Sequence, residues 1–503
     1  MKVINKNGLR LVLCFSLFML LSGCQSWVSG GEKIAVKPGD GSEAEKATRY
    51  AEIAPLITAP VDGRPVRVYK VAFDGTMNDR EKVPLGERAT MVARIARLIN
   101  ANHYYPGAGM QGVEPDIGDA MTGKSSKGLA LKATNDFYAV AQQWHREDPN
   151  AEIRIFITGF SRGAATAREF MNQVNKIWPE KFPAFATDLP HFYAMLYDTV
   201  STGQKETLDL RLPSNVDYLV HFVATDEARN ILFTPTVDVF SLKPDICQDR
   251  HKSGIPARIN TIYLPGAHSD VGTSYSEGIG DLYIILSEKF IYMLGLNKTH
   301  SWGLKDDPLL KGRHDSRGLM DKLFAAPDPG KFARIARAEH HVQVKPQSPT
   351  RHAENQHRLQ KMQKANAERA SSLSTSRIEA VTANFTVVRI GADFAVKDVS
   401  PDVDLASVSI SRGNGGYNLR FRLMSSMARA NIFLNKAWLS KIGKTPVPLA
   451  YTWLITSDKT LLALWVGDQQ VSIKEVKKTG SITIPVIPAE SNWRAQIGKP
   501  ECR

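Results

Sequence analysis

Residues 152–170, "EIRIFITGFSRGAATAREF", combine an apolar, β-branched run with a glycine-flanked serine and a following stretch of small residues. The apolar run is typical of a buried strand, and the small residues are typical of a helix that packs closely against it. Gly159-Phe160-Ser161-Arg162-Gly163 fits the pattern G-x-S-x-G, in which a sharp strand-to-helix turn exposes a serine hydroxyl. We therefore predict a nucleophile elbow with Ser161 at its tip.

The residues after Ser161 include candidates for the base and the acid that a serine nucleophile requires. A hydroxyl is a poor nucleophile near neutral pH, so it needs a histidine base whose ring is oriented by a carboxylate. On a strand-turn-helix of this kind, the chain order is Ser, then Asp or Glu, then His. The strand pattern "HFYAMLYDTVST" delivers Asp198, and the strand pattern "RINTIYLPGAHSDVGTSY" delivers His268 in a glycine-rich loop. The sequence predicts a Ser161–His268–Asp198 triad.

A second carboxylate competes for the orienting role. Asp270 follows His268 by two residues, in "HSD". Side chains at i and i+2 in a loop seldom face each other well enough for the in-plane bond that the His Nδ1–H needs. We expect Asp270 to bond local N–H groups of its own loop and Asp198 to orient the base.

An oxyanion hole requires two N–H donors directed at the developing negative charge. One donor is expected to be the backbone of Arg162, directly after the nucleophile. The loop "FDGTMND" after an early strand pattern offers Gly75 and Thr76 for the other. Asp74 and Asn78 are expected to hold this loop through side-chain hydrogen bonds.

Residues 118–126, "GDAMTGKSS", match the phosphate-binding pattern G-x-x-x-x-G-K-[ST]. Such a loop works only between a buried strand and the first turn of a helix. The preceding stretch, "PGAGMQGVEPDI", contains glycines and prolines where an apolar strand is needed. We interpret this match as a polar surface loop and disfavour a nucleotide hydrolase.

Residues 1–23 have the features of a bacterial signal peptide. A basic start precedes the apolar stretch Leu11–Leu21, which is too short to span a bilayer and is followed by small residues. The end of this segment, "LSGC", resembles a lipobox in which Cys24 becomes the lipidated N-terminus. Gln25 in the second position of the mature chain favours the outer membrane of the cell envelope. Residues 24–65 are predicted to be a polar tether.

Composition and charge limit the classes of partner. The chain is 43% apolar and 23% charged, which is typical of globular protein. Loss of residues 1–23 removes three basic side chains and lowers the net charge from +13 to +10. A basic envelope protein is attracted to anionic lipid head groups. The sequence has no basic run with interleaved aromatic residues that would indicate nucleic-acid binding. Cys247 and Cys502 can form a disulfide outside the cytoplasm or can remain two buried thiols.

Changes in composition and in hydrophobic periodicity predict several segments after the tether. Alternating strand and helix patterns over residues 66–340 indicate an α/β sheet with flanking helices. Within this region, residues 280–296 have the spacing of a core helix more than of a lid. Residues 341–375 are polar and basic with few large apolar side chains, and we interpret them as a linker. Period-two alternation over residues 376–503 predicts a smaller β-rich module.

Six motifs occur in an order that resembles a known family. They are "FDGTMND", "YYPGAG", "GFSRGAATAR", "LYDTV", "HFVATDEARNILF" and "LPGAHSDVG". Together they resemble the α/β-hydrolase-like domain of unknown function that is shared with type VI secretion phospholipase effectors of the first family. The resemblance implies ester hydrolysis with phospholipids as the substrate class, and it matches Ser161, Asp198 and His268 to the nucleophile, the acid and the base. The signal peptide favours a resident envelope lipase over an injected effector.

Two functions of different class remain open at this level. The first is a serine esterase or phospholipase that hydrolyses lipid esters at the bacterial envelope, without a metal ion or a cofactor. The second is a lipid-anchored binding or scaffold lipoprotein that keeps an inactive hydrolase shell. A fluorophosphonate probe distinguishes the two functions, because it labels only an activated serine.

Overall fold

The structure is a computed structural model of the 503-residue chain. It describes residues 32–34, 40, 47, 50–51, 53–84, 87–229, 233–239, 258–297, 312–317, 339–370, 379–390, 393–397, 399, 407–422, 429–435, 447–455, 460–466, 469–476 and 479–483. The predicted signal peptide, Cys24, Cys247 and Cys502 lie outside these residues.

The chain divides into two compact units. The first comprises the described parts of Met1–Ile34, Glu52–His300 and Arg313–Ser371, and the second those of Ala35–Ala51, Ser301–Gly312 and Ser372–Arg503. In the part of the chain that the structure describes, no helix has the length and apolar character to cross a membrane.

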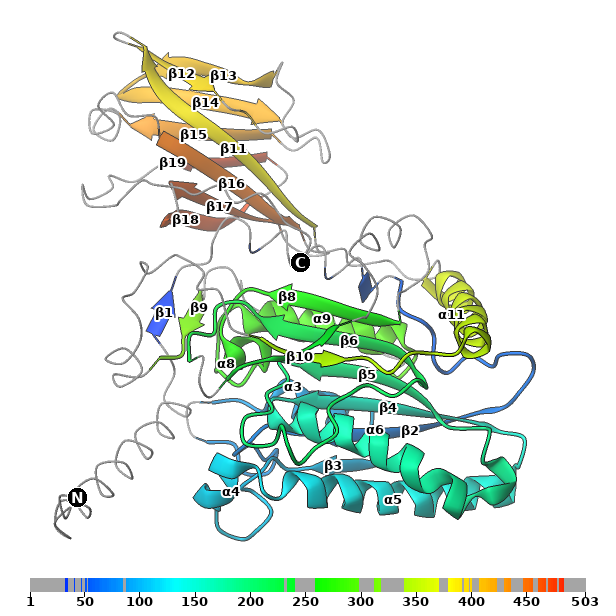
Figure 1. The fold of residues 1–503 in the computed structure, drawn as a ribbon. Helices are drawn as coiled ribbons and strands as arrows, with labels where there is room; N and C mark the ends of the chain where they lie inside the picture. Colours follow the sequence, from blue (N-terminus) through cyan, green and yellow to red (C-terminus); the bar gives the residue numbers. More distant parts are fainter. Residues whose placement is uncertain are drawn as a thin grey trace, which may run out of the picture. The chain divides into compact units, whose positions relative to one another are not determined.

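The first unit is built on a parallel sheet of six strands (Figure 1). Every residue of β4 (Glu152–Phe160), β5 (His191–Tyr197) and β6 (Val216–Ala224) is buried, which explains why most of their side chains are apolar. The α/β class predicted from the sequence is therefore confirmed. In spatial order the strands are β3 (His103–Tyr105), β2 (Val66–Phe73), β4 (Glu152–Phe160), β5 (His191–Tyr197), β6 (Val216–Ala224) and β8 (Ile259–Leu264).

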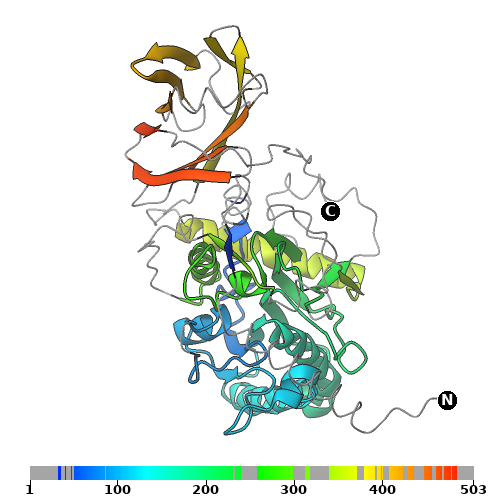
Figure 2. The ribbon, with the colours of Figure 1, turned by 90° about the vertical axis from the view of Figure 1, so that its left-hand side faces the viewer.

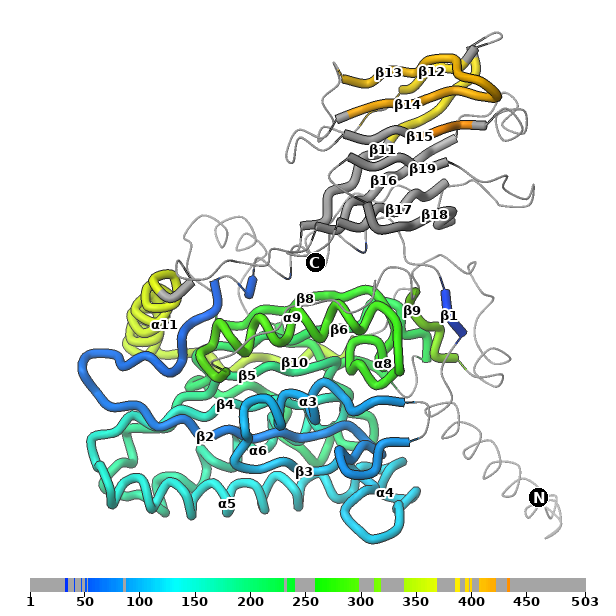
Figure 3. The backbone as a smooth tube through the Cα atoms, turned by 180° about the vertical axis from the view of Figure 1, so that it is seen from behind, coloured from blue at the N-terminus to red at the C-terminus, as the bar shows by residue number. Residues whose placement is uncertain are grey.

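Helices cover both faces of this sheet. On the face toward the viewer in Figure 1, α5 (Ser126–Glu147) packs beside α6 (Arg162–Lys181). Figure 3 shows α3 (Met91–Leu98) and α9 (Gly280–Met293) on the opposite face. Most of α9 is buried, so it is a core helix and not a lid, as its spacing predicted.

The segment expected to be a linker instead belongs to the first unit. β10 (His340–Gln343) pairs in parallel with β7 (Thr236–Val239). α11 (Pro349–Ala370), yellow-green in Figures 1 and 2, follows it as a 22-residue helix. Its side chains Leu359 and Met362 are fully buried.

Charge, rather than a broad apolar face, joins α11 to the sheet. Arg358 donates to Asp217 Oδ2 at 3.0 Å and to Glu152 Oε1 at 3.2 Å, and Arg351 donates to Asp217 Oδ1 at 3.1 Å. Burial raises the pKa of Asp217, but His191 and the two arginines outweigh this effect and lower it below its usual value. The local sequence is polar, which is typical of a solvated linker. It does not reveal these ion pairs, because the carboxylates that pair with the arginines lie far away in the sequence.

The end of the predicted tether also packs on the first unit. Ile57 is fully buried, and its N–H donates to the Leu294 carbonyl at 3.1 Å. Asn366 of α11 donates to the Ala54 carbonyl at 2.6 Å. The folded unit therefore begins before residue 65.

The second unit confirms the β-rich character predicted for the C-terminal region. A five-stranded sheet has the order β12-β11-β16-β17-β18, and a four-stranded sheet has the order β13-β14-β15-β19. Phe385 and Phe421 are buried with ring centroids 4.4 Å apart. The strands are β11 (Glu379–Ile390), β12 (Asp393–Lys397), β13 (Ser409–Gly413), β14 (Gly416–Arg422), β15 (Arg429–Asn435), β16 (Val447–Ile455), β17 (Thr460–Val466), β18 (Gln469–Val476) and β19 (Thr479–Thr483).

Candidate functional site

Ser161 occupies the turn between β4 and α6. Its backbone has φ +57° and ψ −127°, a conformation that costs a non-glycine residue about 1–3 kcal/mol. Glycine is required on both sides. A Cβ on Gly159 would lie 2.8 Å from Ala164 Cα, and a Cβ on Gly163 would lie 2.2 Å from the Asp74 carbonyl oxygen. The strained turn and its two close approaches are those expected of a nucleophile elbow.

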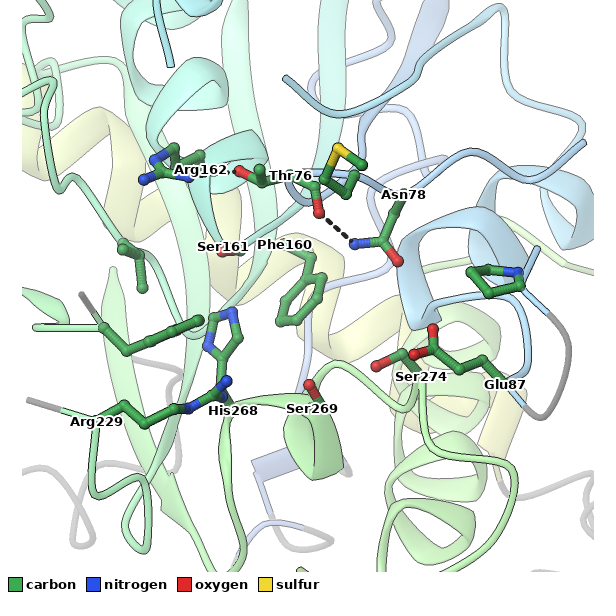
Figure 4. A pocket seen from close by; sticks show the side chains of 14 residues that line it. Thr76, Asn78, Glu87, Phe160, Ser161, Arg162, Arg229, His268, Ser269 and Ser274 are labelled. Atoms are coloured by element: carbon green, nitrogen blue, oxygen red, sulfur yellow. Dashed lines mark hydrogen bonds between the residues drawn. The ribbon is translucent and has the colours of Figure 1, made fainter. Parts of the chain in front are cut away.

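His268 and Asp198 meet at the carboxyl edge of the sheet. His268 begins α8 (His268–Val271) shortly after β8, and Asp198 directly follows β5 with φ +39°. The His268 Nδ1 lies 2.6 Å from Asp198 Oδ2, and the Ala224 N–H donates to Asp198 Oδ1 at 3.0 Å. Figure 4 shows the imidazole facing the same pocket as Ser161. With Nδ1 bonded to the carboxylate, Nε2 is the ring nitrogen that a serine base would use.

Asp270 has different partners. Its Oδ2 accepts from the Ala267 N–H and the His314 N–H, both at 2.9 Å. Its Oδ1 lies 2.7 Å from His314 Nδ1. Asp270 therefore shapes the loop that carries His268 and pairs with a different histidine.

The predicted oxyanion donors differ in whether their backbone N–H groups are already hydrogen-bonded. The Gly75 N–H donates to Asp74 Oδ1 at 2.8 Å, so this donor is already engaged within its own loop. Glycine is needed at position 75 for packing, since a Cβ there would lie 2.6 Å from Phe160 Cδ1. Thr76 and Arg162 line the pocket with Ser161, which leaves their backbone N–H groups as the candidate pair.

Asp74 and Asn78 hold this loop, as predicted. Asn78 Nδ2 donates to the Thr76 carbonyl at 2.9 Å. Asp74 also accepts from the Thr90 hydroxyl at 2.7 Å and from the Tyr104 hydroxyl at 2.6 Å. Burial raises the pKa of Asp74 to about 6, although these hydrogen bonds oppose the shift.

The side chain of Arg162 has a role that the sequence did not reveal. Its buried guanidinium donates to the carbonyls of Ala120 at 2.7 Å and Met121 at 3.0 Å, and to Thr76 Oγ1 at 3.0 Å. Burial lowers the pKa of this guanidinium. One side chain thereby joins the loop of Thr76 to the end of α4 (Ile117–Thr122).

Aromatic rings surround the histidine. The Phe160 ring stacks on His268 with centroids 4.6 Å apart, and the Phe233 ring meets it edge-on at 4.8 Å. Both rings line the pocket, together with Met77 and Val200. Imidazole orientation is therefore set by packing as well as by the carboxylate.

The motif "HFVATDEARN" supplies carboxylates that bind the backbone of the histidine loop. Glu227 Oε2 accepts from the His268 N–H at 3.2 Å, and Asp226 Oδ2 accepts from the Gly266 N–H at 2.6 Å. Glu227 also forms a bidentate pair with Arg229, at 2.8 Å for both bonds, and this arginine lies over the Phe233 ring. The motif is visible in the sequence, but the roles of these residues appear only in the fold.

The segment 118–126 does not form a phosphate-binding loop. Gly118 lies within α4 instead of after a strand, and Lys124 is exposed in the turn before α5. The Asp119 carboxylate accepts the N–H groups of Gly109 at 2.6 Å and Ser125 at 2.7 Å. Donors that would bind a phosphate are thus used by an acidic side chain, which supports the interpretation as a surface loop.

Among the residues that the structure describes, no group of three or more His, Cys, Asp or Glu side chains is placed to hold a metal ion.

Comparison with known proteins bears out the resemblance seen in the sequence. Residues 68–178, which run from β2 to α6 and include Ser161, match the family model described as "T6SS, Phospholipase effector Tle1-like, catalytic domain". The crystal structure of an uncharacterized protein from Pseudomonas aeruginosa is similar over 84% of this chain and 88% of that chain, at 12% identity and a TM-score of 0.34. A search of curated proteins gave no match.

Proposed function

We propose that this protein is a serine esterase that hydrolyses carboxylic ester bonds of phospholipids. The observation that carries the proposal is the 2.6 Å contact of His268 with Asp198, in the same pocket as the strained Ser161. The matched phospholipase family model supports the class of substrate.

In this mechanism His268 Nε2 accepts the hydroxyl proton as Ser161 Oγ attacks the ester carbonyl carbon. The carbonyl oxygen becomes an oxyanion facing the N–H groups of Arg162 and Thr76. The tetrahedral intermediate then expels the alcohol, which takes the proton from His268 and leaves an acyl group on Ser161. A water molecule, deprotonated by His268, hydrolyses this acyl-enzyme, and Asp198 stabilises the imidazolium that forms in each half of the cycle.

The lining of the pocket favours a lipid ester. Phe160, Phe233 and Val200 give it an apolar wall beside the serine, suited to an acyl chain.

Activity-based labelling tests this proposal directly. The purified protein should react with a fluorophosphonate probe, mass spectrometry should place the adduct on Ser161, and phospholipid vesicles should release fatty acid. A folded protein that neither reacts with the probe nor releases fatty acid would instead be an inactive hydrolase shell that binds lipid or protein.

We also propose that the protein is a lipoprotein of the bacterial envelope, anchored through Cys24 and residing in the outer membrane. Cys24→Ser is expected to abolish metabolic incorporation of palmitate and to move the protein out of the membrane fraction. A salt-sensitive fraction of the protein should stay bound to the membrane. Without the lipid anchor, the basic mature chain is still attracted electrostatically to anionic lipids. Unchanged acylation and membrane retention would contradict the anchor.

A further inference from the structure

One charged group of the pocket has no partner in the described part of the chain. Glu87 lines the same cavity as Ser161 and His268, and among the described residues its carboxylate makes no hydrogen bond or ion pair. The two arginines of the lining differ in this respect. Arg229 is paired with Glu227, and the guanidinium of Arg162 is bonded to backbone carbonyls.

The backbone around Glu87 is held in place. Glu87 forms an antiparallel bridge with Tyr275. Next to it, the Arg88 N–H donates to the Ser274 carbonyl at 3.0 Å, and Arg88 Nε donates to the Thr273 carbonyl at 2.8 Å. The carboxylate therefore projects from a fixed segment instead of a free loop.

Several polar side chains share one part of the pocket, beside Pro84. In Figure 4, Glu87, Ser274 and Asn78 lie on the side away from Arg229, and all of them line the cavity. Phe233 packs against Arg229 and His268 on the other side. An ester held at Ser161 with its acyl chain beside Phe233 would direct its polar end toward Glu87.

A partly buried carboxylate without a counter-charge calls for a cationic ligand. Burial raises the pKa of Glu87 to about 7, because the ionised form loses hydration without gaining an ion pair. A ligand ammonium would restore that lost interaction, and hydrogen bonds to charged groups are among the stronger ones in proteins. Phospholipids with an ethanolamine head group carry such an ammonium, whereas phosphatidylglycerol carries only the negative phosphate.

We propose that Glu87 is a specificity-determining residue that binds the ammonium of a zwitterionic phospholipid head group. The enzyme thereby prefers amine-bearing phospholipids to anionic ones. This inference rests on the proposed function and names a subclass of its substrates.

Competing substrates in one vesicle provide the test. Phosphatidylethanolamine and its N-acetyl derivative, with identical acyl chains, are mixed in the same vesicles, and mass spectrometry follows the two lysolipids. Acetylation replaces the ammonium by a neutral, slightly larger amide, so the Glu87 variant and not the wild-type ratio alone isolates the effect of charge. Because both lipids are in the same vesicles, the product ratio is independent of surface binding and of the amount of active enzyme. Wild-type protein should prefer the free amine by roughly tenfold or more, and Glu87→Gln should bring the ratio close to one.

Two further variants sharpen the result. Glu81→Gln makes the same charge change in the same region on a side chain that is 69% exposed and outside the pocket, and it should keep the wild-type ratio. Glu87→Lys should reverse the preference and favour phosphatidylglycerol in a mixture with phosphatidylethanolamine, because the introduced ammonium attracts the anionic lipid.

The outcomes separate this inference from the proposed function. Hydrolysis of both lipids with the same ratio in wild type and Glu87→Gln would overturn the inference and leave the esterase intact. Loss of turnover on both lipids in both Glu87 variants would also overturn it, since Glu87 would then serve the fold or the chemistry. A wild-type protein that hydrolyses neither lipid nor a p-nitrophenyl ester would refute the esterase itself, and the inference with it.

Discussion

Ser161→Ala is expected to lower ester turnover by about six orders of magnitude, to the limit of detection, on both p-nitrophenyl esters and phospholipid vesicles. No other group can form the acyl-enzyme in the proposed mechanism, so binding and the oxyanion donors alone would remain. Steady-state hydrolysis assays and fluorophosphonate labelling measure the loss. The melting temperature should hardly change, because the hydroxyl faces the pocket and the new side chain keeps the same backbone.

Two control variants accompany this prediction. Lys124→Ala should leave turnover and stability close to wild type, since Lys124 is an exposed side chain outside the pocket. Ser161→Gly should be as inactive as Ser161→Ala but more stable, because glycine adopts φ +57° without strain. Turnover by Ser161→Ala at a near wild-type rate would mean that the nucleophile is another residue.

Asp198→Asn is expected to lower turnover by about 10⁴-fold at a nearly unchanged melting temperature. The amide can still accept the Ala224 N–H at Oδ1, so the local fold is kept. It places an NH₂ or a neutral oxygen against His268 Nδ1, which favours the wrong tautomer and no longer stabilises the imidazolium. Turnover of a p-nitrophenyl ester, measured together with thermal unfolding, gives both quantities.

Asp270→Asn is the matched comparison. It disturbs bonds to the Ala267 N–H and to His314, so it should reduce the free energy of unfolding by about 1–3 kcal/mol along with activity. The Asp198–His268 contact would still be present in this variant. If the two variants exchanged their phenotypes, Asp270 would have to be assigned as the acid that orients the base.

Local patterns predicted the part of the site that depends on short stretches of chain. The elbow could be predicted because the strand, the serine and the flanking glycines are consecutive, and steric conflict at Gly159 and Gly163 admits no larger side chain. Asp198 and His268 could be predicted because parallel strands bring their carboxyl ends to one edge of the sheet. The distance between the two side chains, however, depends on how the strands are arranged in the folded sheet.

Partners distant in the sequence explain why the linker prediction failed. Residues 341–375 have the composition of a solvated linker, yet Arg351 and Arg358 pair with Asp217, more than 130 residues earlier. A neighbouring residue matters in another place, where the N–H of Gly75, a predicted oxyanion donor, is bonded to the carboxylate of the adjacent Asp74. In both places a polar group has several possible partners, and composition does not indicate which of them is chosen.

The sequence by itself therefore determined the α/β class, the position of the elbow and the residues that can supply an acid and a base, because these depend on periodicity, local sterics and strand order. The sequence also favoured Asp198 over Asp270 as the partner of His268, and the structure gives the distance at which they meet. Only the tertiary structure decided that α11 is part of the first unit and that Glu87 enters the pocket without a partner among the described residues. The physical reason is that hydrogen bonds and ion pairs form between whichever groups the folded chain brings within about 3 Å, whatever their separation in sequence.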